Sequence, residues 1–384
     1  MQLVSVLKKV SYKDIVGVFY TFLAFVPGKI LKRYKSNILI ISEREDEARD
    51  NGFWFFKYIV QNKDASNVYY AIKKNCDDYN NIKSISNNII EFGSFKHCIY
   101  TWAANKYVSS QYSNGMPNRI LYYLWIYRLY DLKFCFLQHG VTQNRSLYLE
   151  EPASRVSFLS CASEKEAQFM RDLGYSLNTA QITGFCRYDG LHYYESDEKQ
   201  IFIMMTWRKY LSNCSEEEFK STSYYSELAG LLNKIIKSNK LSNYKFLICF
   251  HPGMKKYKHL FELNSSNIKI IENSQYSFSE LINKSKIFIT DYSSIAFDFA
   301  YLKKEVLYFQ FDLDEFREKH LQKGYFDYHK DGFGPVFSSS ETLIKYLEMG
   351  YRINKDDYIK RGCSFFAFND SCNCERNYNK IMRL

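Results

Sequence analysis

The sequence of 384 residues lacks the two glycine-rich motifs that are typical of nucleotide binding. No apolar run is followed by G-x-G-x-x-G, and G-x-x-x-x-G-K-S/T does not occur, so dinucleotide cofactors and P-loop binding are disfavoured. An arginine-rich arm, zinc-finger spacing and the aromatic signature of RNA-binding domains are also missing. These absences argue against nucleic acid as a partner.

Closely spaced pairs of cysteines are nearly missing as well. Of ten cysteines only Cys372 and Cys374 lie close together, whereas a structural zinc site usually needs four ligands in two close pairs. We therefore expect no metal site and no cofactor, and we expect reduced cysteines, as in a cytosolic protein. We also expect no signal peptide, because no cleavage site of small residues follows the first apolar run.

A long apolar run is missing too, and the longest candidate lies in residues 1–36. The run from Ile15 to Val26 is shorter than the roughly 20 apolar residues of a spanning helix. Lysines and arginines flank it on both sides, as in helices that lie at the surface of an anionic membrane. We predict peripheral attachment to the cytoplasmic face of the membrane; the alternative is a first helix packed on the protein's own core.

The net charge of +10 indicates an anionic partner, such as acidic lipid or a phosphorylated substrate. The length and the hydrophobic content of 46% fit two domains of ordinary size. Short continuous apolar runs separated by helical patterns are typical of parallel sheets buried on both faces. We predict an α/β protein with two doubly wound domains, residues 37–192 and 193–384, that face a cleft.

Polar residues follow several of the predicted strands at the point where each strand ends. His139 follows the run at 134–138, Arg208 follows 201–205, and His251 follows 246–250. Asp291, Ser293 and Ser294 stand between the run at 287–290 and a helical pattern. Ligands of doubly wound sheets bind outside the carboxyl ends of the strands, so these residues form the predicted site. A serine pair at a helix start also suits phosphate.

Several segments together resemble the CDP-glycerol:poly(glycerophosphate) glycerophosphotransferase family, whose members make teichoic acids and capsules. The order and spacing of the segments carry the resemblance, which covers roughly residues 37 to 376. The matching segments are ISEREDEARDNGFWFFKYI (41–59), LQHGVTQ around His139, TGFCRYDGL around Arg187 and Asp189, MTWRKY around Arg208, FHPG around His251, TDYSSIAFDFAYLKKEVLYFQFD (290–312) and GFGPV around Pro335.

The resemblance implies a glycosyltransferase-B-like architecture of two Rossmann-like domains in a peripheral membrane enzyme. The C-terminal domain is expected to bind CDP-glycerol or CDP-ribitol. The N-terminal domain is expected to present a polyol-phosphate or lipid-linked acceptor and the membrane contact. The implied reaction transfers a polyol-phosphate unit to an acceptor hydroxyl and releases CMP. A divalent cation on the pyrophosphate stays open.

This reaction suggests roles for the strand-end residues. An attacking alcohol needs a base, and we predict His139 in that role, because histidine accepts a proton near neutral pH. His251, Arg208, Ser293 and Ser294 are predicted to hold the pyrophosphate and to offset charge on the leaving CMP.

Six other residues are further candidates. Asp291 orders its turn or contacts the glycerol of the donor. Arg187 and Asp189 form an interdomain ion pair at a hinge or contact substrate. Arg376 is predicted to reach back to the phosphates. Asp312 and Asp314 are candidates for ribose binding or solvated side chains.

Two other functions fit parts of the sequence. A glycosyltransferase of the same architecture would use a nucleotide sugar, and a non-catalytic protein would bind membrane or nucleic acid through its positive charge. The clustering of polar residues at strand ends argues against the second. The choice between glycerol and ribitol, primase and polymerase, and teichoic acid and capsule stays open, as does the oligomeric state.

Overall fold

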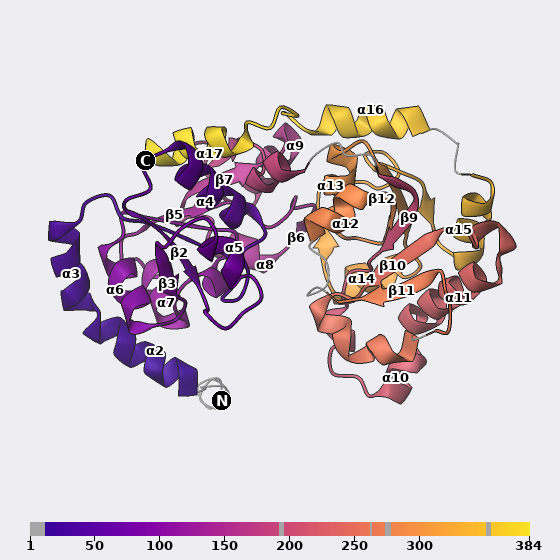
Figure 1. Cartoon of the computed structure of the whole chain (residues 1–384), viewed down its shortest axis with the longest axis horizontal. Coiled ribbons are helices and arrows are strands. Elements are labelled where there is room, and N and C mark those ends of the chain that lie inside the picture. Colours follow the sequence, from indigo (N-terminus) through magenta and orange to yellow (C-terminus); the bar gives the residue numbers. More distant parts are fainter. Residues whose placement is uncertain (1–11, 192–195, 262, 273–277, 351–354) are drawn as a thin grey trace. The chain divides into compact units, whose positions relative to one another are not determined.

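A computed structural model describes the chain except residues 1–11, 192–195, 262, 273–277 and 351–354 (Figure 1). It contains two compact units. Unit 1 comprises residues 1–139, 148–190 and 370–384, and unit 2 comprises residues 140–147 and 191–369.

Unit 1 is built on a parallel seven-stranded sheet with the order β3-β2-β1-β4-β5-β7-β8. The inner strands are continuous apolar runs, and all residues of β1 and β2 are buried, as expected for a sheet covered on both faces. The strands are β1 (Leu39–Ser42), β2 (Val68–Ile72), β3 (Ile89–Glu91), β4 (Lys106–Ser109), β5 (Lys133–Phe136), β7 (Val156–Cys161) and β8 (Ala180–Ile182).

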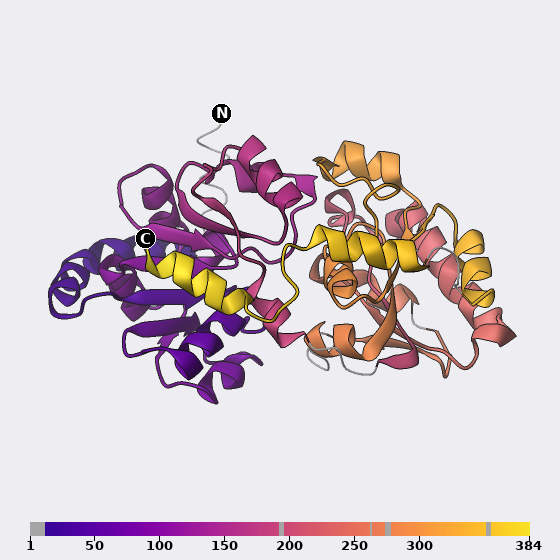
Figure 2. The same ribbon diagram turned by 90° about the horizontal axis from the view of Figure 1, so that it is seen from above.

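Helices flank this sheet, and the C-terminal helix is one of them. Phe55, Phe56 and Ile59 pack in one buried cluster with Cys374 and Ile381, so the end of the chain joins the core of unit 1. Figure 2 shows the yellow C-terminal helix beside the elements of unit 1. The helices are α2 (Tyr12–Leu23), α3 (Phe25–Tyr34), α4 (Asn51–Asn62), α5 (Tyr79–Lys83), α6 (Phe95–Ala103), α7 (Arg119–Ile126), α8 (Leu147–Glu150), α9 (Glu164–Asp172), α17 (Asn373–Met382) and the 3-10 turns η1 (Ser113–Gly115) and η2 (Cys186–Gly190).

Unit 2 repeats this plan with a six-stranded parallel sheet in the order β11-β10-β9-β12-β13-β15. The strands are β9 (Asp197–Ile203), β10 (Lys245–Cys249), β11 (Ile268–Ile271), β12 (Ser285–Thr290), β13 (Glu305–Phe309) and β15 (Val336–Phe337). The helices are α10 (Glu216–Lys220), α11 (Ser223–Lys237), α12 (Phe278–Lys284), α13 (Ile295–Tyr301), α14 (Leu313–Lys319), α15 (Ser340–Glu348), α16 (Lys355–Phe365) and the 3-10 segments η3 (Lys209–Leu211), η4 (Asn239–Leu241) and η5 (Pro252–Phe261).

Two segments belong to a different unit from the one that a division in the middle of the chain would give. Residues 140–147 contain β6 (Asn144–Arg145), which pairs antiparallel with β14 (Gln322–Lys323) of unit 2. Residues 370–384 return to unit 1. The predicted boundary at residue 192 instead assigned residues 140–147 to the N-terminal domain and residues 370–384 to the C-terminal domain. Residue 192 itself lies outside the described residues.

The N-terminal helices α2 and α3 lie beside α7 and α6 (Figure 1). Gly28 allows the close approach, because a Cβ there would lie 2.4 Å from Cβ of Trp102. The opposite side exposes large apolar residues, among them Phe19, Phe22, Leu23 and Val26, each more than 60% exposed. Among the described residues no single helix has the length and composition of a membrane span; Ile15–Leu23 and Phe25–Tyr34 reach them only as a pair bent by 42°. Residues 1–11 of the predicted membrane segment lie outside the described part.

Candidate active site

In unit 2 the strand order reverses between β9 and β12, so the loops after these two strands diverge at the carboxyl edge of the sheet. Doubly wound sheets bind ligands at such a point. Arg208 follows β9 and Asp291 follows β12, while Asp312 follows the neighbouring strand β13. The three predicted or candidate residues thus lie together at the edge where a ligand is expected.

Arg208 lies beneath this edge, with no exposed surface. Its Nη2 donates to Asp291 Oδ2 at 2.8 Å, and its Nε donates to Asp312 Oδ2 at 2.8 Å. Its Nη1 donates to the Thr206 carbonyl at 2.6 Å. Desolvation alone would lower the pKa of Arg208, but Asp291 and Asp312 outweigh it and raise the pKa. The guanidinium is therefore a permanently charged, fully paired group inside the unit.

This burial corrects two expectations from the sequence. A direct contact of Arg208 with phosphate does not fit a guanidinium that is buried and held by two carboxylates. A ribose contact of Asp312 does not fit a side chain that is 1% exposed and accepts Arg208 and the Tyr292 hydroxyl. Asp291 also accepts Thr206 N at 2.8 Å and Tyr292 N at 2.5 Å, so it orders the turn, which was one of its two predicted roles.

The serine pair lies above this buried layer and is partly exposed. Ser293 Oγ accepts the Ile295 N–H at 3.3 Å, at the start of α13. Ser294 precedes the helix without a side-chain capping bond. The structure leaves the Ser294 hydroxyl facing no partner among the described residues, which keeps it available to a ligand.

His251 follows β10 at the same edge and packs beside Trp207, with ring centroids 5.7 Å apart and planes at 10°. Its Nδ1 accepts the Gly253 N–H at 3.1 Å, so the neutral imidazole carries its proton on Nε2. Gly253 leaves room for Trp207, because a Cβ there would lie 3.0 Å from the indole. His251 is thereby fixed as a donor through Nε2 in its neutral form.

His320, which the sequence did not single out, packs on the same indole edge-on at 5.0 Å. Its Nδ1 accepts the Lys209 N–H at 3.1 Å, so its neutral form also carries the proton on Nε2. Desolvation, assisted by Arg208 and Lys209, lowers the pKa of His320 to about 4. It is therefore neutral near pH 7, unlike the usual histidine that titrates there.

His139 belongs to unit 1, directly after the buried Gln138 that follows β5, and its side chain is exposed. The pKa of the ring is nevertheless lowered, first by desolvation, with Asp50 opposing and Arg44 and Arg187 assisting. The Ser110 backbone also raises the pKa, but desolvation outweighs it. The net pKa lies below the usual value, so the ring is mostly neutral near pH 7.

The remaining predicted residues also lie in unit 1. Arg187 donates from Nη1 to the His139 carbonyl at 2.7 Å and to Asp50 at 2.9 Å, so it is not paired with Asp189. Asp189 instead accepts the N–H groups of Asn373 and Cys374 at 3.0 and 2.7 Å, at the start of α17. Asp189 thus holds the start of the C-terminal helix, a role that was not among its predicted ones.

Arg376 lies on α17 and donates to both carboxylate oxygens of Asp370, at 2.7 and 2.9 Å. It also donates to the Thr183 carbonyl at 3.1 Å. The structure thus brings Arg376 together with residues of unit 1.

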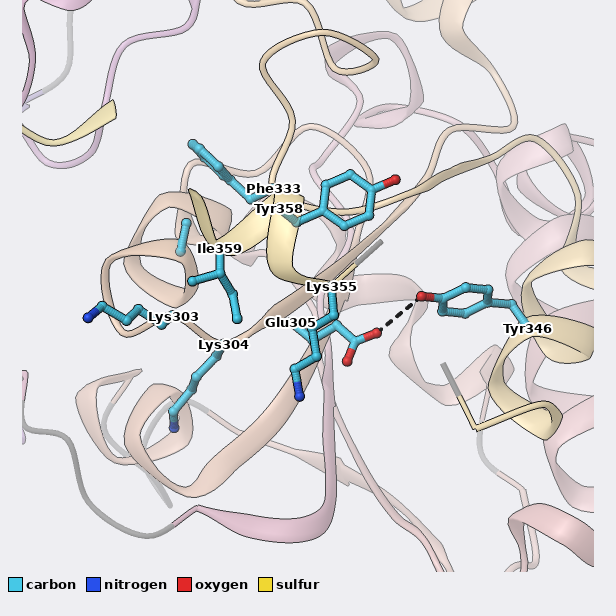
Figure 3. A pocket seen from close by; sticks show the side chains of 9 residues that line it. Lys303, Lys304, Glu305, Phe333, Tyr346, Lys355, Tyr358 and Ile359 are labelled. Atoms are coloured by element: carbon cyan, nitrogen blue, oxygen red, sulfur yellow. Dashed lines mark hydrogen bonds between the residues drawn. The ribbon is translucent and has the colours of Figure 1, made fainter. Parts of the chain in front are cut away.

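A pocket in unit 2 lies away from these residues, at the beginning of β13 (Figure 3). Lys303, Lys304, Glu305, Tyr346 and Tyr358 are among its lining residues, and the Tyr346 hydroxyl donates to Glu305 at 3.4 Å. Lys304 Nζ donates to the Ile282 and Ser285 carbonyls, so this lysine is occupied in structure. Within the described residues, no group of three or more His, Cys, Asp or Glu side chains is arranged to hold a metal ion.

Comparison with known proteins decides the family. The model of the CDP-glycerol:poly(glycerophosphate) glycerophosphotransferase family matches residues 18–383. The chain belongs to this family. The predicted resemblance is thus confirmed, and the predicted class, a transferase of CDP-activated polyol phosphate, agrees with this membership.

Relatives of this glycerophosphotransferase family member include the minor teichoic acid biosynthesis protein GgaB of Bacillus subtilis (strain 168), which is 33% identical over 368 residues. That alignment covers 90% of the chain but only 40% of GgaB. The teichoic acid poly(glycerol phosphate) polymerase of Bacillus spizizenii is 23% identical over 394 residues, covering 91% of the chain and 92% of the polymerase.

Among solved structures, the wall teichoic acid polymerase TagF has a TM-score of 0.68 at 18% identity, and the match covers 97% of this chain and 98% of that one. At this identity the likeness is evidence for the fold. It agrees with the predicted α/β class with parallel sheets.

Proposed function

We propose that the protein transfers a glycerol-phosphate or ribitol-phosphate unit from its CDP-activated donor to a hydroxyl of a teichoic-acid-like or capsular polymer, and releases CMP. The observation that carries the proposal is the state of His139. It is exposed just after β5, and its pKa is lowered, so the ring is neutral at the carboxyl edge of the sheet of unit 1. A neutral, oriented imidazole is the group that an attacking alcohol needs.

In the proposed step the acceptor oxygen attacks the phosphorus of the polyol-phosphate group, and the new P–O bond replaces the bond to CMP. The hydroxyl proton passes to the basic nitrogen of His139. CMP leaves with the electron pair of the broken bond and carries the developing negative charge. Catalysis of such transfers depends mainly on positioning and on electrostatic stabilisation.

On the donor side, His251 offers an Nε2–H that can donate to a phosphate oxygen without adding a full charge. Ser293 and Ser294 offer hydroxyls and backbone N–H groups at the same strand edge. Arg208 acts from below as a positioning residue, because its pairing with Asp291 and Asp312 ties together the loops that follow β9, β12 and β13. Oriented dipoles in a fixed frame stabilise developing charge without reorganising.

The proposal assigns the acceptor side of the reaction to unit 1, which carries His139, and the donor side to the strand edge of unit 2, in a chain of glycosyltransferase-B-like architecture. The acceptor is then presented by unit 1 and the CDP donor is bound by unit 2. The chain itself gives one support: Gly140, which follows His139, already belongs to unit 2. Within that segment, Gln143 donates to the Tyr292 carbonyl at 2.6 Å, beside the serine pair.

We also propose that α2 and α3 attach the protein peripherally to an anionic membrane. Their exposed aromatic and aliphatic side chains would enter the lipid surface, and Lys29, Lys32 and Arg33 would meet acidic headgroups. Attachment at this face suits an acceptor that is itself linked to lipid.

The test is CMP release by the purified full chain, with CDP-glycerol and CDP-ribitol in parallel and a polyol-phosphate acceptor. We expect release from one donor, and a loss of at least about a hundredfold in His139→Ala and in His251→Ala, the usual range for a general acid–base group. His259→Ala is the matched control, since His259 is an exposed histidine of unit 2 that pairs with Glu216. Turnover of a nucleotide sugar without CMP release from either donor would instead favour a glycosyltransferase, and full activity in both variants would favour a non-catalytic binding protein.

A further inference from the structure

The backbone that carries His139 is held in an unusual conformation. Gln138 has φ of 58°, in the left-handed region that side chains other than glycine rarely adopt. It is buried, and its Nε2 donates to the Ser160 carbonyl at 2.6 Å and to Glu166 at 3.2 Å. Such a conformation persists only where the surrounding structure fixes it, and it often occurs at functional sites.

Asn51 fixes the same loop from the other side. It has no exposed surface, and its Nδ2 donates to the carbonyls of Leu137 and Gln138 at 3.3 and 2.8 Å. Its Oδ1 accepts the Arg187 N–H at 2.9 Å. One buried amide therefore connects the loop before His139 to the turn that carries Arg187.

The Arg187 side chain completes this connection. Its Nη1 donates to the His139 carbonyl at 2.7 Å and to Asp50 Oδ1 at 2.9 Å. Both partners are mostly buried, with side chains 13% and 20% exposed, so the pair is less screened than an ion pair at the surface. Asp50 directly precedes Asn51 in the chain. Asp50, Asn51 and Arg187 are therefore connected to one another and to the backbone of His139.

We propose that the Arg187–Asp50 ion pair, together with Asn51, positions His139 for its reaction. This inference rests on the proposed function of His139 as the base. It replaces the predicted alternatives for Arg187, an interdomain ion pair or a substrate contact, with a role inside unit 1. None of the three residues needs to touch substrate, so each is a positioning residue.

The charges of the pair act on the imidazole in opposite directions. Desolvation is the largest cause of the lowered pKa of His139; Asp50 raises the pKa, while Arg44 and Arg187 lower it. A base works only when unprotonated, so activity falls as pH falls through its pKa. Removing the charge of Asp50 should lower the pKa of His139 and move the acidic limb of the pH profile to lower pH. Removing the charge of Arg187 should raise that pKa and move the limb to higher pH.

The test measures kcat/KM for CMP release by the full chain from about pH 5 to pH 9 in Asp50→Asn and Arg187→Gln. We expect shifts of the acidic limb in opposite directions, each on the order of half a unit, since the pair is partly solvent-screened. We expect kcat to fall roughly tenfold in Arg187→Gln with little change in KM for the donor. Arg187→Lys keeps the charge, so its acidic limb should return toward that of the wild type.

The matched controls are Glu164→Gln and Arg171→Gln, which alter the Arg171–Glu164 ion pair of α9 in the same unit. Neither residue is among the charges that act on His139, so their profiles should stay in place. A second readout needs no activity: the rate at which diethyl pyrocarbonate modifies His139, followed by peptide mass spectrometry, reports the neutral fraction of the ring at each pH. Each variant gives a signed shift by itself, so one that fails to fold leaves the other as a test.

Limbs that do not move, or that move in the same direction in both variants, would overturn the inference. The chemical titration separates this failure from failure of the proposed function. Opposite shifts together with an active His139→Ala variant would keep the positioning and refute the base. Unmoved limbs together with an inactive His139→Ala variant would keep the base and refute the positioning.

Discussion

Replacing Arg208 by alanine should destabilise unit 2 strongly. The change leaves Asp291 and Asp312 without their cation, and their side chains are 0% and 1% exposed. Breaking a buried ion pair by removing one partner costs about 3–5 kcal/mol, because an uncompensated charge remains in a poorly solvated place. A domain of this size loses about 2–4 °C of melting temperature per kcal/mol, so we expect a decrease of roughly 6–20 °C.

The assay is differential scanning calorimetry of the full chain; under the proposed assignment of the donor to unit 2, the transition of unit 2 is the one that CDP-glycerol should raise. Lys319→Met is the matched control on α14, because the Lys319–Glu315 pair is exposed and such pairs are worth about 0.5 kcal/mol or less. A shift of Arg208→Ala below about 2 °C, combined with loss of CDP-glycerol binding, would refute the buried role. That result would restore the direct phosphate contact that the sequence suggested.

Three further predictions follow from single contacts. His320→Ala should weaken CDP-glycerol binding several-fold, because one hydrogen-bond donor is lost. In isothermal titration calorimetry, His320→Gln should retain part of the affinity and the control His259→Ala should retain all of it. Desolvation lowers the pKa of buried His97 to about 3, so below about pH 6.5 the unfolded state binds more protons than the folded state. The free energy of unfolding should therefore fall toward pH 3, and urea unfolding should show a smaller fall for His97→Gln. Phe19→Ser with Phe22→Ser should reduce co-sedimentation with anionic vesicles, whereas Tyr34→Ser, at the far end of α3, should reduce it less.

The sequence predicted the interior strands well because their signal is local. The runs at 246–250 and 287–290 correspond to β10 and β12, since a continuous apolar run of that length suits a buried parallel strand. No local pattern indicated β3 and β15, which lie at sheet edges and contain three and two residues. Such short strands exist because a neighbour is present to pair with them.

The candidate site shows the same division. His139, His251 and Asp291 were found because each polar residue directly follows an apolar strand, and that pattern is local. Arg208 was found for the same reason, but its role was not, because Asp312 lies 104 residues away in sequence. His320 was missed because a lone histidine after α14 carries no pattern until Trp207 packs beside it.

The sequence by itself determined the fold class, the family and the strand ends where chemistry is expected, since periodicity, strand-end residues and motif order are properties of neighbouring residues. The tertiary structure decided which of those residues are accessible and which are buried and paired. In the folded chain Arg208 is buried, His139 is exposed, Arg187 is hydrogen-bonded to the loop of His139, and the C-terminal helix packs in unit 1. The reason is physical: burial and ion pairing depend on contacts between distant segments, and these exist only after the sheets have formed.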